Sequence, residues 1–182
     1  GIVVDVGRHM NQVLEVNKEE SWAIIQPGVI RNELNEYLES DGLIFGPETS
    51  TQNRAMIGGM MGNNSCGANS VVYRDSRKHL IEVKGFLADG SEITFGELTK
   101  EQFEAKCRGD ESLLETKIYC QIRDILNDKG NIDEILEKFP HEKIFRRNTG
   151  YALDVISKME PFKEDGEPFN FCKLIAGSAG TL

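Results

Sequence analysis

The sequence predicts an α+β domain in which a mixed, largely antiparallel sheet is flanked by helices. Short β-branched runs bounded by turn residues recur through the first half of the chain. Apolar residues spaced three or four apart among charged residues fill residues 97–139, the pattern of amphipathic helices. Between these regions lies a glycine-rich stretch, residues 46–70, without a sustained period. These features predict strands, helices and one long loop.

The first third of the chain contains three strand candidates and a helix candidate. Residues 1–6 form a β-branched run with no preceding turn or cap, which predicts a strand cut from something upstream. Residues 13–16 and 22–27 are further strand candidates, separated by a polar turn. Apolar residues at helical spacing predict a helix over residues 30–38, with Gly42 as its stop.

Residues 46–70 are predicted to be the longest loop of the chain. They hold five glycines, Pro47 and many Ser, Thr and Asn residues. Loops of this length in compact domains are usually functional or disordered. The apolar pairs 56–57 and 60–61 argue against disorder. A functional loop is therefore favoured.

The second half of the chain begins with a hairpin and continues with helices. Residues 80–95 predict two antiparallel strands around an Asp-Gly turn. Amphipathic helices follow over residues 97–139 and are closed by Pro140. A further helix is predicted near Tyr151, and residues 169–175 are predicted as a last strand.

Composition and charge exclude several classes of partner. The chain has 182 residues, with 21 Lys and Arg against 30 Asp and Glu, so its formal net charge is −9. This balance disfavours nucleic acid and anionic membranes, because binding to phosphates depends on clustered Lys and Arg. The sequence lacks an apolar run of the roughly 18 to 20 residues that a transmembrane helix needs, and it lacks a signal-like start. A soluble protein is expected.

The cysteines and histidines show no spacing typical of metal ligands. No pair of the four cysteines has the C-x-x-C arrangement, which favours reduced thiols in a cytosolic protein. The three histidines are scattered along the chain. A metal site within this chain is not expected.

Residues 56–67 carry the strongest local signal for a ligand site. Dense glycines let backbone N–H groups approach an anion such as a pyrophosphate, and interleaved Asn and Ser residues add neutral donors. The stretch matches neither the G-x-G-x-x-G fingerprint nor the P-loop signature, so neither a nicotinamide site nor Walker chemistry is supported. A flexible loop whose glycines serve only turns is the open alternative.

Six short motifs occur in order along nearly the whole chain. They are PGV at 27–29, FGPETS at 45–50, IGGMMGNNSCG at 57–67, LADG at 87–90, NTGYALD at 148–154 and AGSAGTL at 176–182. In this order they resemble the PCMH-type FAD-binding domain of the vanillyl-alcohol-oxidase superfamily. The chain is most similar to the FAD-linked oxidase branch of glycolate oxidase, D-lactate dehydrogenase and D-2-hydroxyglutarate dehydrogenase. The resemblance implies FAD as cofactor and the second subdomain of such a domain as the fold.

The resemblance also implies individual cofactor contacts. The ribityl and pyrophosphate region of the flavin would be lined by Pro47, Glu48, Thr49 and Ser50. The pyrophosphate and the ring edge would be wrapped by Ile57, Gly58, Gly59, Asn63, Asn64, Ser65 and Gly67. The adenine side would be approached by Gly177, Ser178, Gly180 and Thr181. No catalytic residue is assigned.

The departures from the family pattern limit what the chain is expected to do alone. The family's Arg-Gly-Gly-Gly-Thr-like pyrophosphate loop lies upstream of this sequence, and its substrate domain lies downstream. Residues 1–182 are therefore expected to form a partial FAD-binding domain, with a helical insertion near residues 97–140. Ala179 stands where the family usually has a glutamate, which removes a carboxylate near the adenine. The chain alone is expected to bind FAD weakly and to turn nothing over.

Several side chains near the motifs keep two interpretations. Cys66 either packs the loop as a small, semi-apolar residue or acts as a reactive thiol. The three methionines of residues 56–61 either cover the flavin ring or fill a core. Arg146 and Arg147 either meet a substrate carboxylate or a phosphate, or are solvated charges.

The resemblance implies an FAD-dependent oxidoreductase that oxidises a 2-hydroxy acid of the D-lactate, glycolate or D-2-hydroxyglutarate type by hydride transfer to the flavin. Its partners would be the small hydroxy acid and an iron–sulfur electron-transfer module or subunit. Two alternatives remain: another branch, of aryl-alcohol oxidase or alkyl-glycerone-phosphate synthase type, and a non-catalytic nucleotide-binding module. The expected location is the cytoplasm or, in a full-length protein, the periphery of the inner face of the membrane.

Overall fold

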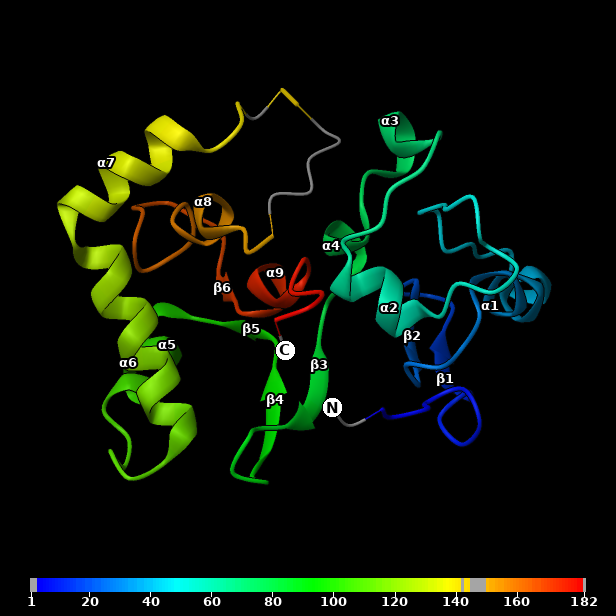
Figure 1. Cartoon of the computed structure of the whole chain (residues 1–182), viewed down its shortest axis with the longest axis horizontal. Coiled ribbons are helices and arrows are strands. Elements are labelled where there is room, and N and C mark those ends of the chain that lie inside the picture. The colour runs from blue at the N-terminus through cyan, green and yellow to red at the C-terminus, as the bar shows by residue number, and fades with distance from the viewer. Residues whose placement is uncertain (1–2, 142, 145–149, 182) are drawn as a thin grey trace. The chain divides into compact units, whose positions relative to one another are not determined.

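The computed structural model describes residues 3–141, 143–144 and 150–181, which form two compact units (Figure 1). Unit 1 comprises residues 3–78 and 177–181, and unit 2 comprises residues 79–141, 143–144 and 150–176. The strands in the described residues form three antiparallel pairs, β1 with β2, β3 with β4 and β5 with β6. Helices accompany them in both units, so the predicted α+β class is confirmed.

Unit 1 begins with a β-hairpin and a helix, as predicted. Its elements are β1 (Val13–Asn17), β2 (Trp22–Ile25), α1 (Arg31–Leu38), the 3-10 helix η1 (Glu39–Asp41), α2 (Ile57–Gly62), α3 (Ser70–Tyr73) and α4 (Ser76–His79). The apolar face of α1 buries Leu34 and Leu38 against Val29, and half-buried residues of β1 and β2 pack on this cluster. Gly42, with φ +70°, ends η1 in the left-handed conformation that glycine adopts without strain.

The predicted first strand is wrong for the part of it that the structure describes. Residues 3–6 form no strand, and Val3 and Val4 are exposed. The carbonyl of Val6 accepts a hydrogen bond from Met10 N, which closes a turn instead of a ladder. A β-branched run favours extended backbone but becomes a strand only with a partner. Residues 1–2 lie outside the described part of the chain.

The glycine-rich stretch contains a helix where a loop was predicted. Residues 57–62 form α2, although three of its six residues are glycines. Each glycine inside a helix costs about 1 kcal/mol relative to alanine, so propensity opposes this helix. Tertiary contacts favour it, because Ile57 N donates to Val29 O and Met60 is buried. Packing has therefore overridden local propensity.

Unit 2 combines a hairpin, a set of helices and a short strand pair. Its elements are β3 (Val83–Phe86), β4 (Glu92–Phe95), β5 (Glu97–Leu98), α5 (Lys100–Cys107), α6 (Leu114–Asn127), α7 (Lys129–Lys138), α8 (Leu153–Ile156), β6 (Phe169–Asn170) and α9 (Cys172–Ile175). The predicted Asp-Gly turn is present, with Gly90 at φ +83° and Ser91 N donating to Asp89 Oδ1. The amphipathic helices and the helix after Tyr151 are also confirmed.

The predicted last strand is partly wrong. Phe169 and Asn170 form β6, but residues 172–175 form helix α9. The side-chain carbonyl of Asn170 accepts a hydrogen bond from Cys172 N, which turns the chain out of the strand. An apolar run of this length does not distinguish a buried strand from a short buried helix.

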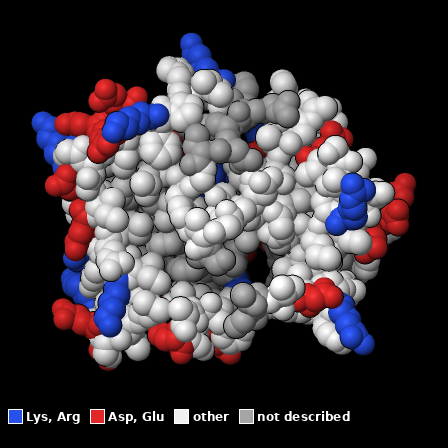
Figure 2. All heavy atoms as spheres, viewed as in Figure 1, with Lys and Arg blue, Asp and Glu red and all other residues white. Residues whose placement is uncertain are grey.

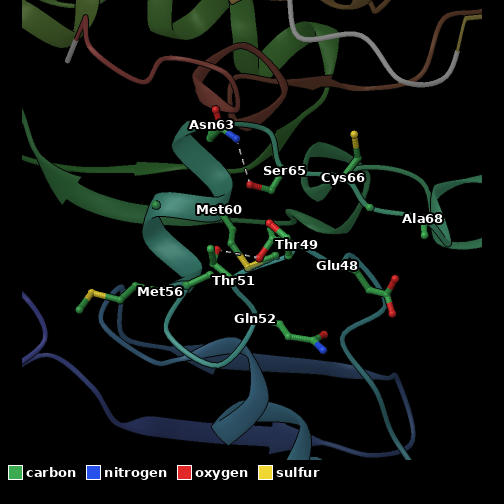
Figure 3. Close-up of a pocket in the computed structure, with 14 residues that line it drawn as sticks. Glu48, Thr49, Thr51, Gln52, Met56, Met60, Asn63, Ser65, Cys66 and Ala68 are labelled. Atoms are coloured by element: carbon green, nitrogen blue, oxygen red, sulfur yellow. Dashed lines mark hydrogen bonds between the residues drawn. The ribbon is translucent and has the colours of Figure 1, made fainter.

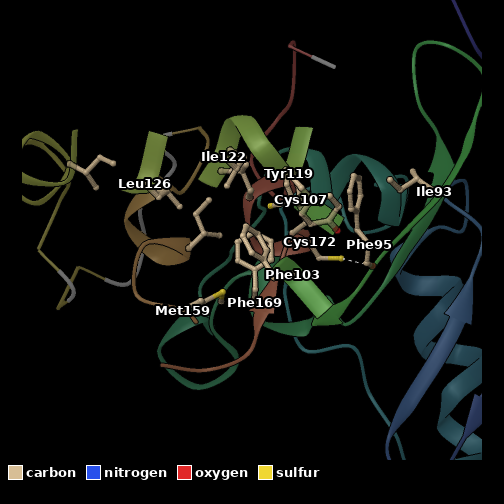
Figure 4. Packing of buried hydrophobic residues seen from close by; sticks show 14 residues of the cluster. Ile93, Phe95, Phe103, Cys107, Tyr119, Ile122, Leu126, Met159, Phe169 and Cys172 are labelled. Carbon is tan, nitrogen blue, oxygen red and sulfur yellow. Dashed lines mark hydrogen bonds between the residues drawn. The ribbon is translucent and has the colours of Figure 1, made fainter. Parts of the chain in front are cut away.

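An aromatic cluster forms the core of unit 2 (Figure 4). Phe103 of α5 is fully buried, and its ring lies 4.7 Å from that of Phe169 and 5.7 Å from that of Tyr119 of α6. The helices of residues 97–140 therefore supply part of this core. That they are an insertion relative to shorter family members stays a prediction.

The outer faces of the helices in unit 2 are highly charged (Figure 2). Glu104 pairs with Arg108 on α5, and Glu134 pairs with Lys138 on α7, both at the i,i+4 spacing that suits a helix surface. Such exposed pairs contribute little to stability. In the described part of the chain, no helix is long and apolar enough to cross a membrane.

Because two thiols are buried in the core of unit 2, we expect the free energy of unfolding to fall in alkali. Burial raises the pKa of Cys172 from 9.0 to about 12 and that of Cys107 to about 11. Above pH 9 the unfolded chain loses these protons while the folded chain keeps them, so stability falls as pH rises from 9.0 towards these folded-state values. Each such proton contributes a slope of about 1.4 kcal/mol per pH unit.

The measurement is urea unfolding followed by circular dichroism between about pH 8 and pH 10. We expect Cys172→Ala to flatten the alkaline decline. Cys66→Ala serves as the matched control, because Cys66 belongs to unit 1. An equal decline in all three proteins would contradict the role of the buried thiols.

Candidate cofactor site

The main cavity of unit 1 lies within the glycine-rich stretch and has a volume of about 950 Å³ (Figure 3). It is lined by residues 48–52, 55, 56, 59, 60, 63 and 65–68. Ligand pockets usually measure about 300–1,000 Å³, so a group of cofactor size fits. The long stretch that the sequence predicts as functional thus supplies the cavity lining.

The N-terminal end of α1 holds one side of the cavity. Arg31 is buried, and its guanidinium donates to the carbonyls of Phe45 and Pro47 at 3.3 and 3.2 Å and to Gln52 Oε1 at 3.1 Å. The amide of Asn35 also bonds the backbone of Phe45, both as donor to its carbonyl and as acceptor from its N–H. These bonds fix the path of residues 45–52.

Helix α2 forms another side, and its two adjacent glycines serve different purposes. A Cβ on Gly58 would lie 2.7 Å from Pro27 Cβ, and Gly58 N donates to Pro27 O. A Cβ on Gly59 would meet nothing within 4 Å, and Gly59 lines the cavity. Gly58 therefore allows the helix to pack, whereas Gly59 leaves space that a ligand can use.

Residues 65–68, which follow α2, pack against Glu48, the first residue in the sequence that lines the cavity. A Cβ on Gly67 would lie 2.5 Å from Glu48 Cβ and 2.8 Å from Glu48 O. Only glycine permits this approach of the two backbone segments. Cys66 and Ser65 line the cavity beside it, and Ser65 Oγ accepts from Asn63 Nδ2 at 3.2 Å (Figure 3).

Residues 177–181 attach to the C-terminal end of α2. Gly177 N donates to Met61 O at 3.2 Å, and Ala179 N donates to Gly62 O at 2.8 Å. These bonds satisfy carbonyls that the end of a helix leaves without an internal partner. Thr181 Oγ1 closes the segment on itself by donating to Ser178 O at 2.7 Å.

The structure brings some of the predicted contact residues into the cavity and not others. Those that line it are Glu48, Thr49, Ser50, Gly59, Asn63, Ser65 and Gly67. Those that lie outside its lining are Pro47, Ile57, Gly58, Asn64, Gly177, Ser178, Gly180 and Thr181. Pro47 and Asn64 are almost fully buried, and Ile57 packs on the core of unit 1. Their contact with a cofactor stays a prediction.

The cavity lining also includes residues that the motifs did not assign to the cofactor. Thr51, Gln52 and Ala55 line the cavity but were not predicted, although their position between two motifs is a signal that could have indicated them. Met56 and Met60 line it, but Met60 is 2% exposed and a Cβ on Gly7 would lie 2.7 Å from Met56 Cε, so contact of these methionines with a flavin ring stays a prediction. The predictions for Arg146 and Arg147 lie outside the described residues.

The chemistry of the lining fits a flavin dinucleotide. Hydroxyls of Thr49, Ser50 and Thr51 and the amide of Asn63 offer neutral donors. Among the described residues that line the cavity, Glu48 alone is charged, and in Figure 3 it lies on the side away from Met56. The methionines give an apolar side that suits a planar ring. In the part of the chain that the structure describes, no group of three potential metal ligands is close enough to hold an ion.

Comparison with known proteins agrees with this assignment. Residues 1–96, just over half of the chain, match the family model described as FAD binding domain. The chain therefore belongs to this family, and FAD is the cofactor that the family binds.

The relatives that match this chain are named as dehydrogenases or oxidases of hydroxy acids. Over all 182 residues the chain is 35% identical to the D-2-hydroxyglutarate dehydrogenase of Pantoea ananatis and 34% identical to that of Escherichia coli, and it covers 17% of each. It is also 37% identical over 102 residues to the glycolate oxidase subunit GlcD of Bacillus subtilis, which is 56% of this chain and 22% of that protein. The chain thus spans about a sixth of the length of the dehydrogenases that it matches.

Proposed function

We propose that this chain forms one wall of the FAD site in a flavoenzyme that oxidises a D-2-hydroxy acid. The observation that carries the proposal is the cavity of unit 1, which combines neutral hydroxyl and amide donors, two thioethers and the open space beside Gly59. FAD supplies the redox chemistry by accepting a hydride at its ring. The residues of this chain bind the cofactor, orient it and exclude water.

Within the site, the neutral side chains would hold the phosphate and ribityl groups. Thr49, Ser50 and Asn63 donate without bringing a positive charge, which suits a chain of net charge −9. Met56 and Met60 would pack against the flavin ring. Gly177, Ser178, Gly180 and Thr181 remain proposed contacts near the adenine.

We propose D-2-hydroxyglutarate as the substrate. The support is the extent of the similarity: relatives with this name match all 182 residues, whereas the glycolate oxidase subunit and the D-lactate dehydrogenase of Kluyveromyces lactis match 102 and 90 residues. D-lactate or glycolate is the second candidate. These names favour hydroxy acids over the aryl-alcohol oxidase and alkyl-glycerone-phosphate synthase branches and over a non-catalytic module.

The electron-transfer partner and the location follow as further parts of the proposal. An iron–sulfur module or subunit would take the electrons, and the fact that the Bacillus subtilis relative is named a subunit supports a partner of this kind. The four cysteines are free, which suits the reducing cytoplasm, with or without peripheral attachment to the inner face of the membrane.

The test is anaerobic reduction of a full-length protein that contains this chain. We expect the purified protein to show flavin absorption, and D-2-hydroxyglutarate to bleach it at least about tenfold more efficiently than D-lactate or glycolate, because a site built for a second carboxylate discriminates against substrates that lack it. Equal bleaching by D-lactate would favour the second candidate. Bound flavin that no hydroxy acid bleaches would favour the non-catalytic module.

A further inference from the structure

Asn64 lies directly behind the cavity wall and faces away from the cavity. Its neighbours Asn63 and Ser65 line the cavity, whereas Asn64 does not and is 1% exposed. Its backbone is left-handed, with φ +48°, a conformation that asparagine tolerates better than most residues. Asn64 is therefore buried between two residues that line the cavity.

Both ends of the Asn64 amide are bonded to one segment. Its Nδ2 donates to Asp75 Oδ2 at 3.0 Å, and its Oδ1 accepts from Arg77 N at 2.9 Å. A bond to a carboxylate is stronger than one between neutral groups. Both polar atoms of the amide are therefore engaged by residues 75–77.

A second pair of bonds joins the same two segments. The carbonyl of Ser65 accepts from both the backbone N and the Oγ of Ser76, each at 2.9 Å. Ser76 is buried, as is Ser65. Residues 64–65 are thus held to residues 75–77 by four hydrogen bonds, which we call the Asn64–Asp75 lock.

We propose that Asn64 is a positioning residue for the FAD site and not a cofactor contact: the Asn64–Asp75 lock sets the path of residues 63–67, which present Asn63, Ser65, Cys66 and Gly67 to the cavity. This inference rests on the proposed function, because it takes the cavity to be the FAD site. It also explains why one of two adjacent asparagines lines the cavity and the other is buried.

The test exchanges the two partners of the lock. Asn64→Asp alone places two carboxylates against each other, and we expect FAD affinity, measured by flavin fluorescence in the full-length protein that contains this chain, to fall at least about tenfold. Asn64→Asp combined with Asp75→Asn restores the bond with donor and acceptor reversed, and the new carboxylate still accepts from the backbone of Arg77. We expect this double variant to bind FAD within about threefold of the original chain.

The control is Asn53→Asp, which adds the same charge to an exposed position of unit 1 and should leave affinity unchanged. If Asn64 touched the cofactor directly, the new carboxylate would weaken binding equally in the single and double variants, which would overturn the proposal. Affinity unchanged in Asn64→Asp would also overturn it.

One further measurement keeps the test decisive. The melting temperature of each variant without FAD shows whether it folds. Should Asn64→Asp fail to fold, the double variant carries the test, since a double variant that also fails to fold or to bind contradicts the lock. A full-length protein with the original sequence that binds no FAD would count against the proposed function instead. The variants would then be compared by melting temperature, where the double variant must recover what Asn64→Asp loses.

Discussion

Replacing Gly59 should weaken FAD binding while leaving the fold intact. Gly59→Ala adds one methyl group to open space at the cavity surface, and Gly59→Leu fills more of that space. Overpacking of a formed site costs about 1–3 kcal/mol, so we expect affinity to fall about tenfold for alanine and up to about a hundredfold for leucine. The protein without FAD should become about 0.5–1 kcal/mol more stable with alanine, because helix α2 loses a glycine.

The neighbouring glycines of α2 provide matched controls. Gly62→Ala also meets nothing within 4 Å but lies outside the cavity lining, so we expect the gain in stability without the loss of affinity. Gly58→Ala drives a methyl group against Pro27 and should lower stability.

Flavin fluorescence measures affinity, and alkylation of Cys66 gives a second readout, because Cys66 lines the same cavity. FAD should slow this alkylation in the original chain and in Gly62→Ala, and less so in Gly59→Leu. Equal affinity in the Gly59 and Gly62 variants would show that the cofactor does not use this space.

The strands and long helices of this fold could be predicted because their signals are local. The hairpin of β3 and β4 depends on an Asp-Gly turn, and α6 shows a clear apolar periodicity. Helix α2 could not be predicted, because its glycines oppose a helix and the bonds that favour it are with Pro27 and Val29, too distant in the sequence for a local pattern to reveal. The prediction for residues 3–6 is wrong for the opposite reason: their propensity is for a strand, but a strand needs a partner.

The site residues, too, include some that sequence motifs indicate and others that only the three-dimensional structure reveals. Motif order located the cavity, since seven of the residues that the resemblance indicated line it. It could not separate Asn63 from Asn64, because the difference lies in the left-handed backbone at Asn64. It also passed over Arg31, because a charged residue in the first turn of an amphipathic helix normally faces water.

Replacing Arg31 should unfold or reshape the cavity side formed by residues 45–52. Arg31 is 8% exposed, and within the described residues no carboxylate lies at ion-pair distance from it. Its charge is instead shared among neutral acceptors, which belong to Asn32, Phe45, Pro47 and Gln52. Arg31→Ala removes the donor to Pro47 O and Gln52 Oε1, whereas Phe45 O keeps its bond from Asn35, and we expect unit 1 to lose about 3 kcal/mol of stability.

The single tryptophan of the chain makes this measurable, because Trp22 lies on β2 of unit 1. Its fluorescence during urea unfolding reports unit 1 separately from the helices of unit 2. Arg54→Ala is the matched control: Arg54 is exposed, and removing its charge should cost less than about 0.5 kcal/mol.

Arg31→Lys separates charge from geometry. Lysine keeps the positive charge but lacks the planar fork that reaches four acceptors at once. If the planar fork is required, as its bonds to several acceptors indicate, we expect lysine to recover less than half of the lost stability. FAD affinity should also stay low, because Gln52 accepts a bond from Arg31 and lines the cavity. Full recovery by lysine would show that the buried charge alone is required.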